Sequence, residues 1–212
     1  MLIKNIMTKR VITVPSNTSI GEAKKIMKEH KFRRLPVVDN GKLVGIVIED
    51  RLERVSPRAT TPLLWQVSYL ISHTTLGDIM EKNVVTIDPD ATVEQGVALA
   101  QSRRVGALVV VKKDKVIGIV TTNNFFYGLL NPVLGIGEPG TRIIVPGGGD
   151  GKSAEKILAS INKLGVGIKV LWTLSTPSAE QMDIIIHLDT DDATKIIAEL
   201  QKLGYSASVR PR

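Results

Sequence analysis

Hydrophobic positions in the first part of the chain alternate between two spacings. Helical spacing links Ile20, Ala23 and Met27, which recur at three- and four-residue intervals. Two dense apolar runs follow at 35–38 and 43–47, and runs of this length bounded by polar residues are typical of buried strands. A short strand is expected before the helix and another helix after the second run. The pattern therefore predicts a β-α-β-β-α unit.

The same pattern returns 73 residues further along the chain without a gap over about 45 positions. Ile6-Met7 aligns with Ile79-Met80, Leu35 with Leu108, and Lys42 with Lys115. The equivalent strands of the two copies are 11–14 and 84–87, 35–38 and 108–111, and 43–47 and 116–120. One such unit is too small to bury its own sheet, so we expect the two copies to pack together.

Turn and capping residues support these boundaries. Ser19-x-x-Glu22 and Thr92-x-x-Gln95 have the capping-box pattern that satisfies free N–H groups at a helix start. Asp39-Asn40-Gly41 and Lys112-Lys113-Asp114 lie between the paired strands and predict tight hairpin turns.

A different order of elements is expected after a boundary near residue 137. Strands are expected at 141–145, 168–174, 182–188 and 205–210, and a first helix at 153–164. A second helix is expected to begin at a Thr190 cap, with Asp191 and Asp192 in its first turn, and to end at Leu203. This βαββαβ order is the ferredoxin-like plan. The predicted fold class is α+β.

Charge divides the chain in the same way. The protein has 212 residues and a net charge of +7, with 19 Lys and Arg against 12 Asp and Glu in residues 1–136 but nine of each in 137–212. A basic part beside a neutral part suggests that the first part handles an anion. Nucleic acid, a nucleotide and an acidic protein all remain open at this point.

Several classes of function are disfavoured by composition. The chain has no cysteine, which excludes disulfides, thiolate metal sites and cysteine nucleophiles and fits a reducing cytoplasm. Its three histidines, His30, His73 and His187, are scattered and give little basis for a metal site. No apolar run approaches membrane-spanning length, and the N-terminus lacks a signal-peptide pattern. We expect a cytoplasmic protein with no metal and no membrane association.

The doubled motif resembles the cystathionine-beta-synthase (CBS) domain, whose members occur as tandem pairs. The resemblance rests on the Ile-Met dipeptides, the capped helix starts, FRRLPVVDNGKLVGIV from Phe32 and GALVVVKKDKVIGIVTTNN from Gly106. It predicts one repeat at 1–56, a linker at 57–75 and a second repeat at 76–131. The linker, with an apolar helix at 63–71, resembles that of the acetoin-utilization protein B type, which carries a C-terminal ACT-like domain. That domain is expected at 137–212.

The resemblance also implies a ligand: family members hold adenine nucleotides between the repeats, with Gly-h-h-Thr/Ser-x-x-Asp contacting the ribose. In the second repeat Thr121 is present and Asn124 replaces the acid, whereas Ile48 and Arg51 replace both polar residues in the first repeat. At most one ribose site is therefore expected. The predicted nucleotide-binding residues are Thr121 and Asn124 for ribose, Val84 and Val85 for adenine, Gly106 and Ala107 for close backbone approach, and Arg33 and Arg34 for phosphate.

Simpler interpretations stand beside these. Thr121 and Asn124 also fit a plain helix cap, and Arg33 and Arg34 also fit a solvated surface. In the C-terminal part, 146–153 nearly matches a phosphate-binding P-loop, but a P-loop enzyme needs more β-α units than this part has room for. In an ACT-like domain the same loop makes Gly149 and Asp150 candidate residues for a small effector such as an amino acid, or leaves them as ordinary loop residues.

The predicted function is non-enzymatic: a regulatory sensor that binds an adenine nucleotide as ligand and needs no cofactor. No catalytic set of nucleophile and base is visible. A homodimer and an unidentified protein target are expected, with coupling between ligand site and partner. The alternatives are a basic nucleic-acid-binding regulator, disfavoured because the sequence has no helix-turn-helix or zinc pattern, and a nucleotide-hydrolysing enzyme.

Overall fold

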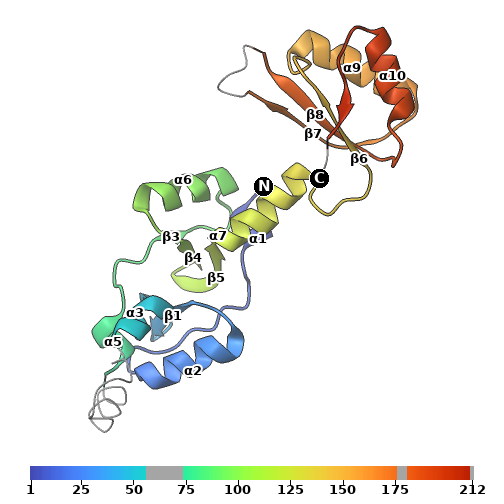
Figure 1. Ribbon diagram of the computed structural model, residues 1–212. Coiled ribbons are helices and arrows are strands. Elements are labelled where there is room, and N and C mark those ends of the chain that lie inside the picture. The colour runs from blue at the N-terminus through green and yellow to red at the C-terminus, as the bar shows by residue number, and fades with distance from the viewer. Residues whose placement is uncertain (56–73, 176–180, 211–212) are drawn as a thin grey trace. The chain divides into compact units, whose positions relative to one another are not determined.

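The computed structural model describes residues 1–55, 74–175 and 181–210 (Figure 1). The chain forms two compact units, Met1–Leu129 and Leu130–Arg212. The expected linker at 57–75 and its apolar helix at 63–71 fall almost entirely outside the described residues. Within the described residues, no helix is both long and apolar enough to cross a membrane.

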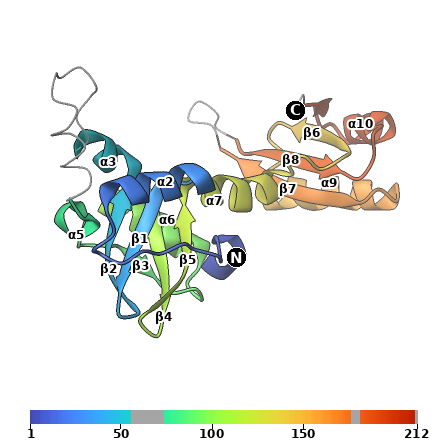
Figure 2. The same ribbon diagram turned by 90° about the horizontal axis from the view of Figure 1, so that it is seen from below.

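The first unit contains the two repeats (Figures 1 and 2). The first repeat consists of α1 (Ile3–Ile6), α2 (Ile20–His30), β1 (Arg34–Asp39), β2 (Lys42–Ile48) and α3 (Glu49–Val55). The second consists of α5 (Leu76–Ile79), β3 (Thr86–Ile87), α6 (Val93–Arg103), β4 (Ala107–Lys112), β5 (Lys115–Thr121) and α7 (Thr122–Phe125). A π-helical turn, η1 (Phe126–Leu130), ends at the first residue of the second unit, and α8 (Asn131–Leu134) is the first helix of that unit.

Capping and turn chemistry act where the sequence predicts. The Ser19 hydroxyl accepts a hydrogen bond from the Glu22 N–H, and Thr92 and Gln95 form a complete capping box. Both hairpin turns have positive φ at their central residues, Asn40 and Gly41 in the first and Lys113 and Asp114 in the second. Positive φ at both positions is characteristic of the type I′ turns that join twisted antiparallel strands.

The leading strand of each repeat is shorter than expected. In the second repeat it is reduced to β3, which pairs in parallel with β4, and in the first repeat to a bridge between Val14 and Val37. The reason is that each leading segment is shared between the repeats. Thr8 exchanges two backbone hydrogen bonds with Ile119 of the second repeat, and Glu81 exchanges the equivalent two with Ile46 of the first.

This exchange extends to the short helices before the leading segments. Ile3 and Ile6 of α1 are buried in the core of the second repeat, and Leu76 of α5 is buried in the core of the first. Gly118 of β5 and Gly45 of β2 leave space for the methionines that follow these helices. A Cβ on Gly118 would lie 2.6 Å from Met7 Sδ, and one on Gly45 would collide with Met80. The Ile-Met dipeptides and the Gly-Ile-Val motifs are therefore complementary parts of one interface.

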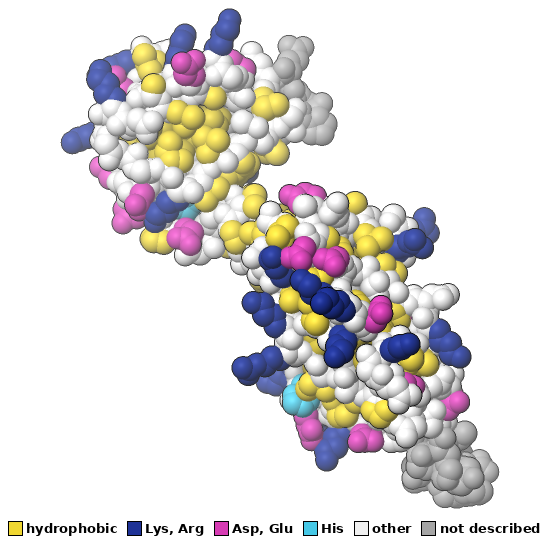
Figure 3. Space-filling view, turned by 180° about the vertical axis from the view of Figure 1, so that it is seen from behind, with side chains coloured by type: hydrophobic (Ala, Val, Ile, Leu, Met, Phe, Trp, Pro, Cys, Tyr) yellow, Lys and Arg dark blue, Asp and Glu magenta, His cyan; other side chains and the backbone are white. Residues whose placement is uncertain are grey.

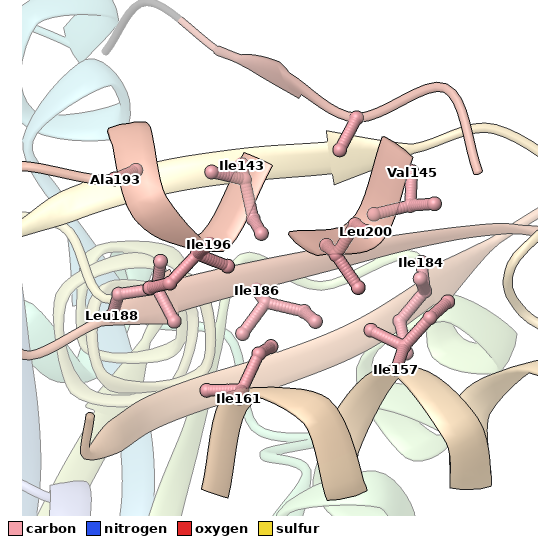
Figure 4. Close-up of a cluster of buried hydrophobic side chains, with 11 residues drawn as sticks. Ile143, Val145, Ile157, Ile161, Ile184, Ile186, Leu188, Ala193, Ile196 and Leu200 are labelled. Carbon is pink, nitrogen blue, oxygen red and sulfur yellow. The ribbon is translucent and has the colours of Figure 1, made fainter. Parts of the chain in front are cut away.

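The second unit has the βαββαβ order that the sequence predicts. Its elements are β6 (Thr141–Val145), α9 (Gly151–Lys163), β7 (Ile168–Leu174), β8 (Asp183–Leu188), α10 (Thr194–Lys202) and β9 (Ser208–Val209). The sheet order is β7-β8-β6-β9, and every strand pair in it is antiparallel. The two helices cover one face, where Ile143, Ile157, Ile186 and Leu200 are fully buried (Figure 4).

One boundary in this unit differs from the prediction. Thr190 is not the cap of α10: its hydroxyl bonds within a turn to Asp192, and the carboxylate of Asp192 accepts from the N–H of Thr194, where the helix begins. Both Thr190 and Asp192 have side chains suited to capping, so local chemistry alone did not decide between them.

Candidate functional site

A cleft of about 840 Å³ lies between the two repeats of the first unit. Its lining residues come from the leading segment of the first repeat, the turn between α2 and β1, and the end of β5 with α7. They are Thr8, Arg10, Val11, Ile12, His30, Lys31, Phe32, Arg33, Arg34, Ile119, Thr121, Thr122, Asn123 and Asn124. Both repeats therefore contribute to one concave surface.

Thr121 and Asn124 form the cap of α7 on one wall of this cleft. The amide oxygen of Asn124 accepts hydrogen bonds from the backbone N–H of Thr121 over 2.9 Å and from its hydroxyl over 2.8 Å. The amide nitrogen donates to the carbonyl oxygen of Ile6 over 2.9 Å and approaches the Thr8 hydroxyl at 3.4 Å. The helix-cap interpretation thus describes the structure, and the cap is tied to α1 as well.

This geometry changes what the pair offers a ligand. The expected role of Asn124 was to accept a ribose hydroxyl through its amide oxygen, but both lone pairs of that oxygen are already used. The Thr121 hydroxyl gives its proton to Asn124 and keeps lone pairs that can accept a ribose O–H. Thr121 is therefore the acceptor that this wall presents, and Asn124 holds it in position.

Arg33 and Arg34 reach the cleft from the opposite repeat. Arg33 is 82% exposed and lies 3.7 Å from the Glu49 carboxylate, measured between Nε and Oε2. Arg34 is partly buried, and its guanidinium extends to Gly106 of the second repeat, where a Cβ would lie 2.5 Å from Nη2. The absence of a side chain at Gly106 thus makes room for Arg34.

The other predicted residues do not line this cleft. Val84 lines a separate hollow of about 460 Å³, together with residues such as Lys42 and Lys82. Val85 packs against the core of the second repeat, and Ala107 packs in the apolar cluster shared by the two repeats.

The exchange of leading segments explains the difference. Val84 and Val85 occupy the positions in the second repeat that Val11 and Ile12 occupy in the first. Because each leading segment crosses to the other repeat, Val11 and Ile12 are the residues that join Thr121 in one cleft. Sequence reasoning missed these two, as well as Thr8, Arg10 and Lys31. The sequence repeat could have indicated them, if the leading segment of each copy had been placed beside the last strand of the other copy.

The glycine-rich loop of the second unit has structural partners throughout. The Asp150 carboxylate caps α9 by accepting from the N–H groups of Lys152 and Ser153. Hydrogen bonds from the side chain and backbone of Ser153 hold the pKa of Asp150 below its usual value. Gly149 donates to the Met182 carbonyl over 2.7 Å, and a Cβ on Gly149 would collide with that same oxygen. The loop connects β6 to α9, and β6 belongs to an antiparallel sheet, whereas P-loop enzymes have a parallel sheet.

No group of three or more His, Asp or Glu side chains able to hold a metal occurs in the part of the chain that the structure describes. On the face drawn in Figure 3, Lys and Arg side chains spread over the repeat unit. The charge surplus seen in the sequence is therefore a surface property of this unit.

Comparison with known proteins identifies the repeats. The family model of the CBS domain matches residues 3–56 and 76–131, more than half of the chain. The chain belongs to the CBS-domain family. Its first unit is a CBS pair, in which the cleft lies between the two CBS domains.

Relatives agree with this assignment. A CBS domain-containing protein of Dictyostelium discoideum is 33% identical over 143 residues, which cover 66% of this chain and 95% of that protein. The crystal structure of a putative acetoin utilization protein from Vibrio cholerae is 29% identical, has a TM-score of 0.53, and is matched over 66% of this chain and 98% of that one. CBSX2, solved in complex with AMP, is 25% identical with a TM-score of 0.52 over 61% and 97% of the two chains.

The match to other relatives is partial. The chain spans 45%, 23% and 22% of the lengths of three further curated proteins that it matches. The similarity therefore concerns a CBS module that recurs within proteins of different size.

Proposed function

We propose that this chain is a non-enzymatic regulatory sensor whose CBS pair binds an adenine nucleotide in the cleft between the repeats. The observation that carries the proposal is the composition of that cleft. It joins a hydroxyl acceptor, Thr121, from one repeat to the guanidinium groups of Arg33 and Arg34 from the other. A hydroxyl acceptor suits a ribose, and guanidinium groups suit phosphate oxygens.

The apolar lining supports a base beside these groups. Val11, Ile12 and Ile119 line the same cleft, and an apolar slot is the environment that an adenine ring favours. The complex of the related CBSX2 with AMP supports the same ligand class. Binding would act on a partner by coupling, which requires that the nucleotide favour one of two states of the protein.

The test is isothermal titration of the full chain with AMP, ADP, ATP and S-adenosylmethionine. We expect saturable binding of at least one of the three nucleotides, and a loss of about tenfold or more in affinity for Thr121→Ala, since this variant removes the acceptor for a ribose hydroxyl. Thr173→Ala, which removes an exposed hydroxyl from β7 of the second unit and away from the cleft lining, is the control. Absence of heat with AMP, ADP and ATP at submillimolar concentration overturns the proposal, because S-adenosylmethionine carries no phosphate and is not a nucleotide.

For the second unit we propose an ACT-like regulatory role with a small effector, such as an amino acid, at Gly149 and Asp150, and pairing of two chains into a homodimer in the cytoplasm. Its βαββαβ order and antiparallel sheet support the ACT-like comparison. Sedimentation tests the pairing, and thermal unfolding with and without a panel of amino acids tests effector binding. A monomer in every condition, with no change in thermal stability, contradicts them.

A further inference from the structure

The cleft carries an excess of positive charge beyond what one phosphate needs. Four permanent cations line it, Arg10, Lys31, Arg33 and Arg34, and no Asp or Glu is among its described lining residues. His30 adds a further titratable group at the same rim. Among the described residues, only Arg33 of the four has a carboxylate neighbour, Glu49, and that contact is a long one between exposed groups.

The other three cations have no carboxylate partner in the described parts of the chain. Arg10, Lys31 and Arg34 form no ion pair with any carboxylate in residues 1–55, 74–175 and 181–210. Elsewhere in the same unit basic residues do find acids: Lys4 and Lys112 both bind the Asp90 carboxylate, at 2.7 and 3.2 Å. Like charges gathered around a concave surface repel one another and focus a positive potential into it.

Local structure places two of these cations. Lys31 ends α2 in the left-handed conformation, with φ of 56°, and the chain turns there into β1, at whose first residue Arg34 stands. Gly106 leaves the space that the Arg34 guanidinium occupies. Arg10 comes from the leading segment that crosses between the repeats. The basic residues thus come from two separate stretches of the first repeat, while the ribose acceptor Thr121 belongs to the second.

We propose that the cleft selects ligands with two or three linked phosphates, so that nucleoside di- and triphosphates bind in preference to a monophosphate. This inference rests on the proposed function for the position of the nucleoside. Each additional phosphate adds negative charge near four cations, of which three have no carboxylate partner among the described residues. S-adenosylmethionine carries a positive sulfonium in place of phosphate, so the same charges disfavour it.

The experiment compares AMP, ADP, ATP and S-adenosylmethionine by isothermal titration at low and high salt without metal ions, with inorganic tripolyphosphate as a fifth probe. We expect affinity to rise by about tenfold per added phosphate and the ATP affinity to fall most steeply with salt. Arg10→Ala and Lys31→Ala should each lower the affinity for ATP by about tenfold and the affinity for AMP by less. Lys163→Ala, which removes one charge from the second unit, should change neither.

The outcomes separate this inference from the proposed function. Equal affinity for AMP, ADP and ATP, or tightest binding of S-adenosylmethionine, overturns the inference and leaves nucleotide binding intact. If tripolyphosphate binds and none of the four adenosine compounds does, the proposed function is overturned and the selection by charge is supported. Failure of all five probes overturns both.

Discussion

The side-chain amide of Asn124 donates a hydrogen bond to the carbonyl oxygen of Ile6 over 2.9 Å, joining the cap of α7 to the last residue of α1. Arg51 makes the equivalent contact in the other repeat, donating from its guanidinium to the carbonyl of Ile79 over 2.8 Å. Both residues stand where the family motif has an acid. At each position the chain therefore has a donor that satisfies a helix-end carbonyl, which an ionised acid cannot do.

Restoring the acid should therefore destabilise this protein. Asn124→Asp replaces a donor by a carboxylate oxygen facing the Ile6 carbonyl, and we expect a loss of about 1–3 kcal/mol in the free energy of unfolding. Urea denaturation measures it. Asn123→Asp makes the same change at the exposed neighbour and should cost little. Equal stability of Asn124→Asp and the natural chain would show that the hydrogen bond to Ile6 contributes nothing.

Adding a methyl group at Gly118 should loosen the interface between the repeats. The new Cβ would meet Met7 Sδ at 2.6 Å and the Thr8 carbonyl oxygen at 3.1 Å, so Met7 must move out of its place. Overpacking of this kind costs about 1–3 kcal/mol, which thermal or urea unfolding of Gly118→Ala will report. Gly151→Ala is the control, because its new Cβ would meet no described atom within 4 Å outside its chain neighbours and its own helix backbone. A Gly118→Ala chain as stable as this control would contradict the proposed fit.

Gly106 and Arg34 should act as a unit in ligand binding. A Cβ at Gly106 would displace the Arg34 guanidinium, whose far end is flexible, so Gly106→Ala should weaken nucleotide binding by about tenfold with little effect on folding. In the Arg34→Ala background the same substitution should have almost no further effect, because the group it displaces is gone. Additive losses in the double mutant would mean that Gly106 contacts the ligand directly.

Asp90 provides a test at low pH. Hydrogen bonds from Lys4 and then Lys112, together with their charges, lower the pKa of its carboxyl. The folded-state pKa of Asp90 lies below the unfolded value of about 3.9, so the ionised carboxylate stabilises the fold. This stabilisation is complete above a pH of about 3.9 and is lost as the pH falls through the folded-state pKa. An NMR titration of the Asp90 side chain should show the lowered pKa, and Lys4→Ala should raise it. A midpoint in the natural chain at the model-peptide value would contradict the contact.

Periodicity and turn chemistry were sufficient for the architecture. The repeat offset, the capping boxes at Ser19 and Thr92 and the hairpin turns are local signals, and each is satisfied by residues a few positions away. The exchange of α1 and α5 between repeats is a long-range arrangement that no local pattern contains. Among the predicted nucleotide-binding residues, Thr121, Arg33 and Arg34 line the cleft, whereas Val84 lines a separate hollow and Val11 takes the corresponding place in the cleft.

The hydrogen-bond state of Asn124 lay beyond sequence reasoning for a related cause. Its spacing from Thr121 is compatible with both a helix cap and a ribose contact. The deciding partner, the Ile6 carbonyl, is 118 positions away in the chain.

The most direct test of the account is the site of nucleotide binding, measured by backbone amide chemical shifts of the full chain during titration with ATP. We expect saturable shifts at cleft residues from both repeats, including Arg10, Lys31, Arg34 and Thr121, with little change at residues of the second unit such as Ile157 and Ile186. Shifts confined to one repeat or to the second unit, or no shifts at millimolar ATP, would contradict the assignment of the cleft between the CBS domains as the nucleotide site.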